Sequence, residues 1–164
     1  MMPAYCPDDA PPGEKAIYAE LQSAEGSHDW VVLHSLGIAN HIRQVEGEAD
    51  FVVMVPDMGI LVIEVKSHQS IDRRSDGTWK LGNDEPTSRG PFRQASEAMH
   101  SLRDYLQKKH VDLRSIPLIS AVWFTSVRAR TMLPADPEWH DWQVMDSEDL
   151  KSAPAAILRT LAAG

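Results

Sequence analysis

The most informative pattern in the chain is a pair of apolar runs, residues 51–55 and 60–65, separated by a Pro-Asp-Met-Gly turn. Two apolar runs on either side of a short turn that ends in glycine predict a β-hairpin. Charged residues interrupt it, because Asp50 opens the first strand and Glu64 and Lys66 lie in the second. Charged side chains are rarely buried unless they are paired or bind a metal. These three residues are therefore the first candidates for chemistry.

The register predicted for this hairpin brings the three charged residues onto one face. We expect a three-residue loop that ends at Gly59 in the left-handed bulge position, which sets Asp50 opposite Lys66. Glu64 then lies diagonal to Asp50, with backbones roughly 7–8 Å apart. A shift of one residue would turn Asp50 to the other face. In the expected register, two carboxylates are placed to share one hard cation.

The remaining periodicity predicts helices and strands on both sides of the hairpin. Residues 1–11, with three prolines and no apolar period, are expected to form a flexible lead, and 12–164 one domain. The polar stretch 37–48 leads into the hairpin, and Glu48 is a secondary site candidate because it precedes Asp50 by two residues. We further expect a helix over 14–23, a strand over 30–36, a small second hairpin over 71–74 and 79–81, a helix over 92–109, a strand over 117–125, a short strand over 139–145, and a last helix from 147 that Pro154 divides.

The composition adds two expectations, one about the net charge of the chain and one about its cellular compartment. The chain has 24 acidic and 16 basic residues, a net charge of −8, which opposes nucleic-acid binding unless cations or a local basic patch intervene. The single Cys6 and the lack of an apolar stretch that spans a membrane favour a reducing cytoplasm and no membrane partner. Candidates for a basic patch, each equally readable as a solvated charge, are Arg73, Arg74, Arg89, Arg93, Lys108, Lys109, Arg128 and Arg130.

An ordered set of short motifs resembles a known family. The spacing of Asp50 from Glu64-Val65-Lys66 is similar to the PD-(D/E)XK nuclease motif, although Ala49 stands where many members have proline. The wider set resembles the nuclease-related domain, NERD, over roughly residues 12–125. The matching pieces are Pro12-Gly13-Glu14, Leu33-His34-Ser35-Leu36, Gly47-Glu48-Ala49-Asp50-Phe51, Gly59-Ile60, Glu64-Val65-Lys66, Asp76-Gly77-Thr78-Trp79 and Pro91-Phe92-Arg93-Gln94.

The resemblance implies a fold and an activity. The fold expected is α/β, a restriction-endonuclease-like αβββαβ core with a central mixed sheet flanked by helices and a small extra hairpin. The activity expected is metal-dependent hydrolysis of phosphodiester bonds in DNA. Asp50, Glu64 and the carbonyl of Val65 would hold Mg²⁺ or Mn²⁺, and Lys66 would assist the attacking water.

Two further site residues, Glu14 and Gln94, come from the same resemblance. Glu14 matches the acidic residue of the family's first helix, although an acidic residue is also favoured at a helix N-terminus by the dipole. Gln94 matches a motif position and would orient water or phosphate, although it would equally form a helix-terminal hydrogen bond. His34 is a candidate phosphate contact or a structural residue, and Trp79 a candidate base-stacking or packing residue.

Other functions remain open at this point. A noncatalytic nucleic-acid-binding or targeting module, belonging to a larger helicase or DNA-processing protein, would keep the same motifs without turnover. The resemblance also implies that a helicase domain occurs in the same full-length chain, although the phosphate-binding motif of a motor is absent from these residues. A plain α/β interaction domain is the third alternative, and would bind neither metal nor DNA.

Overall fold

The architecture was obtained from a computed structural model that describes residues 1–38 and 47–164. Most of the polar stretch predicted between the first two strands thus lies outside the described residues. The elements follow in the order α1 (Pro12–Ser23), β1 (Val31–Ile38), β2 (Gly47–Val55), β3 (Gly59–Lys66), β4 (Ile71–Arg73), β5 (Trp79–Leu81), α2 (Pro91–Lys108), β6 (Leu118–Phe124), α3 (Ala129–Met132), η1 (Asp141–Gln143), β7 (Val144–Met145), η2 (Ser147–Ser152) and α4 (Ala153–Ala163).

A mixed five-stranded sheet forms the centre of the molecule. Its strand order is β1-β2-β3-β6-β7, in which β1, β2 and β3 are antiparallel neighbours. The β3–β6 and β6–β7 pairs are parallel, and α2 provides the crossover between β3 and β6. The predicted α/β class and αβββαβ order are confirmed, and the small β4–β5 hairpin forms a separate two-stranded sheet.

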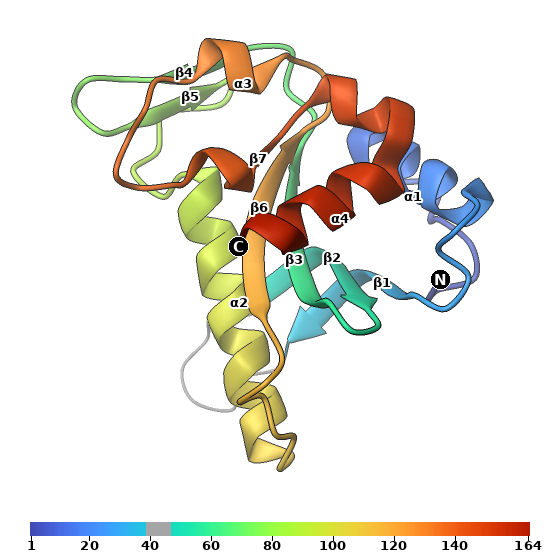
Figure 1. Cartoon of the computed structure of the whole chain (residues 1–164). Helices are drawn as coiled ribbons and strands as arrows, with labels where there is room; N and C mark the ends of the chain where they lie inside the picture. Colours follow the sequence, from blue (N-terminus) through green and yellow to red (C-terminus); the bar gives the residue numbers. More distant parts are fainter. Residues whose placement is uncertain (39–46) are drawn as a thin grey trace.

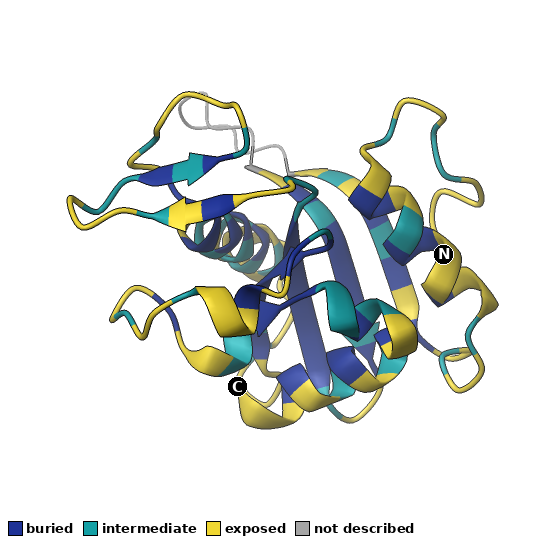
Figure 2. Ribbon diagram, turned by 90° about the horizontal axis from the view of Figure 1, so that it is seen from above, coloured by how far each residue is buried: buried dark blue, intermediate teal, exposed yellow. Residues whose placement is uncertain are grey.

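Helices cover both faces of this sheet (Figure 1). The long helix α2 packs against one face, where Ala98 and Leu102 contact the layer of Val52 and Val62. Helices α1 and α4 lie on the other face. The central strands β3 and β6 are almost wholly buried, the edge strand β1 has exposed residues, and each helix turns an exposed side outward (Figure 2).

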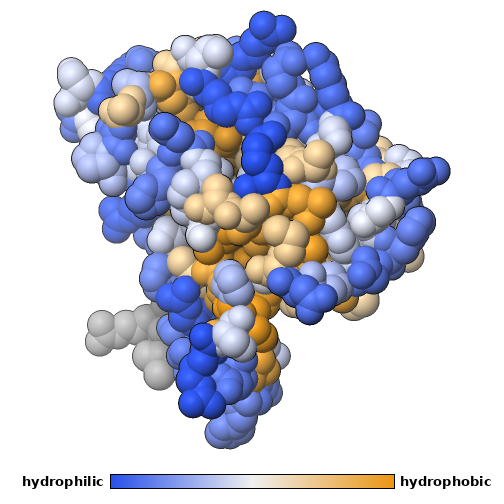
Figure 3. Space-filling model, viewed as in Figure 1, coloured by the Kyte–Doolittle hydropathy of each residue, from blue (hydrophilic) through white to orange (hydrophobic). Residues whose placement is uncertain are grey.

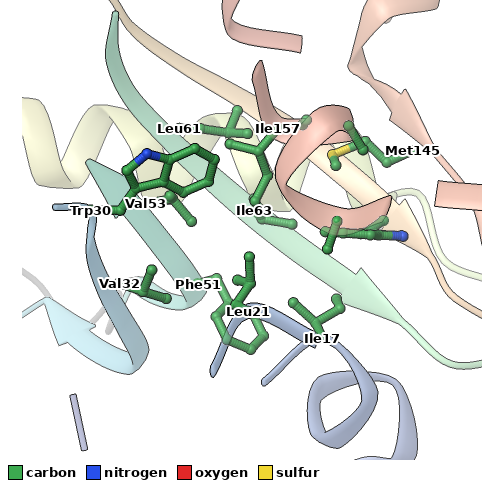
Figure 4. Packing of buried hydrophobic residues seen from close by; sticks show 14 of the residues in the cluster. Ile17, Leu21, Trp30, Val32, Phe51, Val53, Leu61, Ile63, Met145 and Ile157 are labelled. Atoms are coloured by element: carbon green, nitrogen blue, oxygen red, sulfur yellow. The ribbon is translucent and has the colours of Figure 1, made fainter. Parts of the chain in front are cut away.

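The core between the sheet and the pair α1 and α4 is apolar and closely packed. Figure 4 shows its side chains converging from the sheet and both helices. Alternate residues of the hairpin supply the sheet side, because successive side chains of a strand point to opposite faces. The labelled members are Ile17, Leu21, Trp30, Val32, Phe51, Val53, Leu61, Ile63, Met145 and Ile157. This core fixes the direction of the hairpin faces, and so of Asp50 and Glu64.

The hairpin register differs from the prediction by two residues. Val55 pairs with Gly59 and Val52 with Val62, so the loop is 56–58 and Asp50 falls opposite Glu64 rather than Lys66. The left-handed loop residue is Asp57, at φ 62°, instead of Gly59. Because the shift is even, every side chain keeps its predicted face. The two carboxylates therefore become direct cross-strand neighbours.

Gly59 is still required, for a reason the sequence pattern did not indicate. It begins β3 at φ 138°, and a Cβ there would lie 2.6 Å from the carbonyl oxygen of Pro117. The Ile60 N–H donates to that same carbonyl at 2.8 Å. Gly59 thus permits the close approach of β3 to the start of β6.

The small hairpin is closed by an aromatic cluster. Trp79 is fully buried and packs with Phe92, Phe124 and Trp139, at centroid distances of 5.9, 6.3 and 5.5 Å. The packing role for Trp79 is therefore confirmed, and the ring is not available to stack on a base. The cluster attaches β5 to the start of α2, next to Gln94.

The C-terminal elements are shorter than the pattern predicted. The strand expected over 139–145 contains only two strand residues, Val144–Met145, preceded by the turn η1. The last helix is divided as expected, because η2 ends at Ser152 and Pro154 lies in the first turn of α4. The short helix α3 was not predicted.

The first residues of the chain contact β1. Met2 donates its N–H to the carbonyl of Val32 and accepts from the N–H of His34, both at 2.8 Å. The flexibility expected for residues 1–11 remains a prediction. Within residues 1–38 and 47–164, no helix combines the length and apolar character needed to cross a bilayer.

Candidate functional site

The candidate site lies at the C-terminal end of β3. An open pocket of about 460 Å³ is hollowed there, beside the start of α1. It is lined by Pro11, Glu14, Asp50, Glu64, Val65, Lys66, Ser67 and His68. The structure thus brings Asp50, Glu64, Lys66 and Glu14 together around one pocket, whereas Gln94 is not among its lining residues.

A larger hollow of about 570 Å³ lies at the other end of β3, around the turn between β2 and β3. Its lining is mostly apolar and includes Met54, Met58 and Ile116. It contains the carboxylates Asp29 and Asp57 but no Lys, Arg or His. The smaller pocket differs in that it combines carboxylates with a lysine and a histidine, which suits it to acid–base or phosphate chemistry.

Asp50 is held in place by the backbone of the neighbouring strand. Its Oδ2 accepts a hydrogen bond of 2.7 Å from the N–H of Val65. Burial, followed by the nearby carboxylate of Glu64, raises the pKa of Asp50 from an ordinary 3.8 to about 7, although the Val65 N–H and Lys66 act in the opposite direction. Two carboxylates forced together and partly removed from water are an arrangement that a bound cation would relieve.

Lys66 is fixed by two hydrogen bonds at the edge of the pocket. Its Nζ donates to Oε1 of Glu64 and to Oε1 of Gln94, each at 2.7 Å, and 15 % of its side chain remains exposed. An ammonium group has three donors. Two are used by Glu64 and Gln94, and one remains for water or a phosphate oxygen in the pocket.

Gln94 lies in the first turn of α2 and faces Lys66 instead of the open pocket. Its Oε1 accepts from Lys66, while its Nε2 donates to the carbonyl of Arg89 at 3.2 Å. The amide therefore connects the site to the loop before α2. The bond to Arg89 is the helix-terminal hydrogen bond weighed from sequence, whereas the contact with Lys66 was not foreseen.

Glu14 approaches the pocket from α1, with its carboxylate paired to a buried histidine. Oε2 of Glu14 lies 2.6 Å from Nε2 of His34, whose side chain is 0 % exposed. Pro12 begins the helix, and the N–H of Gly13 donates to the hydroxyl of Ser67 at 2.9 Å. Because His34 is buried, it does not reach a phosphate; it contacts Glu14.

A further sequence candidate lies outside the pocket, and one ionisable pocket residue was not a candidate. Glu48 is exposed on β2 and does not line the pocket. His68 lines the pocket, with its Nε2 2.8 Å from Oδ2 of Asp84, and was not singled out from sequence. Its position two residues after Lys66 was the available signal, whereas nothing in the pattern pointed to Asp84.

The donor set at the site fits one hard divalent cation. Asp50 and Glu64 supply carboxylate oxygens from β2 and β3, each one residue beyond the last pair of these strands, Phe51 with Ile63. The carbonyl of Lys66 accepts from Thr125 and faces β6, so the alternation of carbonyls along a strand turns that of Val65 toward β2 and Asp50. Oxygen ligands of this kind are those that Mg²⁺ and Mn²⁺ prefer.

Glu14 stands outside this donor set. Across the described parts of the chain, no three His, Cys, Asp or Glu side chains converge closely enough to hold a metal ion between them. A cation at this pocket would therefore rest on the Asp50 and Glu64 carboxylates with a backbone carbonyl. The remaining coordination positions would be left to water or substrate.

Fold and site together define the chain as an α/β protein with a restriction-endonuclease-like core. Residues 11–125 match NERD, the nuclease-related domain, and the chain belongs to this family. The match includes α1, β1 to β3, the small hairpin, α2 and β6, and hence every residue of the pocket. It does not bear out the fusion to a helicase. No curated protein and no solved structure was found to match.

Proposed function

We propose that this NERD domain is a metal-dependent nuclease that hydrolyses phosphodiester bonds in DNA. The observation that carries the proposal is that Asp50 and Glu64, each one residue beyond the last pair of β2 and β3, line the same open pocket, with Lys66 fixed at its edge. Asp50, Glu64 and the carbonyl of Val65 would hold Mg²⁺ or Mn²⁺. When bound, such an ion acidifies water and neutralises charge on a phosphoryl group.

Lys66 contributes charge and orientation. Because Glu64 and Gln94 each accept one of its N–H groups, the third is directed by geometry and needs no reorganisation during the reaction. That donor is suited to a water molecule or to an oxygen of the phosphate that gains negative charge. Gln94 acts through Lys66 by holding its ammonium group.

Arg89 and Arg93 are the residues best placed to contact a nucleic-acid backbone. They precede Gln94 by five residues and by one, are 51 % and 62 % exposed, and share a single carboxylate, that of Glu97, which leaves a net positive charge beside the site. By contrast, the other arginine candidates from sequence, Arg73, Arg74, Arg128 and Arg130, each pair with carboxylates elsewhere. Guanidinium groups suit phosphate recognition because their donors match its oxygens.

The test is cleavage of plasmid and single-stranded DNA with Mg²⁺ or Mn²⁺. We expect cleavage by the wild type that chelation abolishes, and a loss of about 10²-fold or more in Lys66→Ala, since that variant loses a donor fixed for the transition state. Lys109→Ala, an exposed lysine on a different part of the chain, is the matched control and should cleave normally.

The same experiment separates the enzyme from a binding module. Binding of metal and DNA by the wild type, without cleavage, would support the noncatalytic nucleic-acid-binding module instead. If neither metal nor DNA bound, both readings would fail and a plain interaction domain would remain.

A further inference from the structure

His34 is a buried ionisable residue to which the proposed reaction assigns no role. It lies on β1 opposite Phe51, the residue that follows Asp50 on β2. Its ring stacks on Phe51 at a centroid distance of 4.7 Å and meets the ring of Tyr18 edge-on at 5.8 Å. The ring plane is thus fixed by packing, and its Nε2 is aimed at Glu14.

The surroundings of the ring determine which nitrogen carries the proton. Nδ1 is buried and has no hydrogen-bond partner within residues 1–38 and 47–164. A proton on Nδ1 would be an unsatisfied buried donor, which is unfavourable. The hydrogen-bond geometry places a proton on Nε2, which donates to the Glu14 carboxylate; the hydroxyl of Ser35, at 3.4 Å, is a longer second contact of the same nitrogen.

This hydrogen bond uses one carboxylate oxygen of Glu14 and leaves the other without a contact to His34. Oε2 accepts from His34, and Glu14 lines the pocket together with Asp50 and Glu64. Among the described residues, no three acidic, His or Cys side chains are close enough to hold an ion between them. Because Glu14 lines the same pocket, its other oxygen is available to a water molecule there.

We propose that His34 is a positioning residue, which orients Glu14 so that its free oxygen accepts a hydrogen bond from a cation-bound water. The inference rests on the proposed function, because it needs a cation at Asp50 and Glu64. Outer partners of this kind fix the orientation of metal-bound groups, and their loss commonly weakens metal affinity or activity by about 10–100-fold.

The test measures Mn²⁺ affinity in the absence of DNA, from the electron paramagnetic resonance signal of free Mn²⁺. His34→Leu removes the donor, His34→Gln keeps an N–H at the same distance along the side chain, and Glu14→Gln removes the charged acceptor. We expect about 10–100-fold weaker binding in His34→Leu and in Glu14→Gln. His34→Gln should return to within about twofold of the wild type, and the double variant Glu14→Gln/His34→Leu should bind no more weakly than Glu14→Gln alone.

A merely structural histidine would give a different result. The inference is overturned if a folded His34→Leu binds Mn²⁺ as the wild type does, if His34→Gln fails to restore binding, or if the two single losses multiply in the double variant. Thermal unfolding in chelator establishes that each variant is folded. Should His34→Leu not fold, His34→Asn replaces it, since its amide is too short to reach Glu14.

Asp50→Asn separates this inference from the function on which it rests. If the wild type binds Mn²⁺ no better than Asp50→Asn, the proposed metal site fails and the role of His34 fails with it. If Asp50→Asn abolishes binding while the His34 variants bind normally, the metal site stands and only the positioning role is lost.

Discussion

Asp50 makes the stability of the metal-free protein depend on pH. Its pKa of about 7 in the folded protein lies above its ordinary value of 3.8, so the folded state retains a proton that the unfolded chain releases between these values. Stability therefore falls as pH rises through this window. Between pH 5 and pH 8 we expect a loss of roughly 2–3 kcal/mol in the free energy of unfolding, measured with urea in chelator.

Asp50→Asn should remove most of this loss, because the amide is neutral at both pH values and still offers an oxygen to the N–H of Val65. Asp104→Asn, on the exposed side of α2, is the control and should keep the wild-type slope. Mg²⁺ should stabilise the wild type more at pH 8 than at pH 5, since it competes with the proton on Asp50. Parallel pH profiles for the wild type and Asp50→Asn would contradict this account.

At the residue scale, the sequence identified charged groups more readily than their partners. Asp50, Glu64 and Lys66 could be recognised because charged residues inside apolar strands violate the usual pattern. The contact between His34 and Glu14 depends on how α1 sits against β1, and that between Lys66 and Gln94 on how α2 sits against β3. Such distances between elements are set by packing, which periodicity does not encode.

At the element scale, Gly13 determines how closely α1 approaches the end of the sheet. A Cβ at this position would overlap the side-chain oxygens of Ser67 and Thr125, which follow β3 and β6. Gly13→Ala should push the start of α1, and Glu14 with it, away from the pocket. We expect destabilisation of about 1–3 kcal/mol in urea unfolding, together with weaker Mn²⁺ binding.

Gly37→Ala is the matched substitution, because a Cβ there meets nothing within 4 Å among residues 1–38 and 47–164. It should leave both measurements close to the wild type. If Gly13→Ala left both stability and Mn²⁺ binding unchanged, as Gly37→Ala should, then displacing α1 would not affect the site. The close packing at Gly13 would then have no role in function.

The elements themselves were largely predictable, and the errors have physical causes. Strong helical periodicity defined α1 and α2 to within two residues at their starts, and the apolar runs defined β2, β3 and β6. The hairpin register was wrong because Asp57 adopts the left-handed conformation that was expected of Gly59. The short strand β7 and the helix α3 depend on contacts with β6 and its neighbours rather than on local pattern.

At the scale of the whole molecule, the negative net charge is unfavourable for binding an anionic partner such as DNA. The net charge of −8 repels nucleic acid, so binding has to depend on local features. Figure 3 shows apolar residues gathered in the middle of one face and hydrophilic residues around them. Arg89 and Arg93 lie at the start of α2, near the site, whereas Lys109 and Arg114 follow its far end.

Removing the two arginines near the site should weaken DNA binding and reduce its dependence on salt. Each phosphate contact contributes about 0.9 to the slope of log affinity against log salt on duplex DNA, so Arg89→Ala/Arg93→Ala should lower the slope by about 1.8. Fluorescence anisotropy with Ca²⁺ in place of Mg²⁺ measures binding without turnover. Lys109→Ala/Arg114→Ala removes the same charge at the other end of α2 and should leave the slope nearly unchanged.

Glu97→Gln tests the same surface in the opposite direction. Although burial acts to raise the pKa of Glu97, hydrogen bonds from Arg89 and Arg93 lower it, so the carboxylate is charged at neutral pH and occupies both guanidinium groups. Replacing the carboxylate with an amide should free these groups for phosphate and tighten DNA binding.

Removing any acidic residue would also raise the affinity through net charge alone. The comparison is therefore Glu148→Gln, which removes an exposed carboxylate that pairs with Arg128 and Lys151. If both substitutions tightened binding equally, the overall charge of the protein would govern the encounter, and Arg89 and Arg93 would have no special place in it.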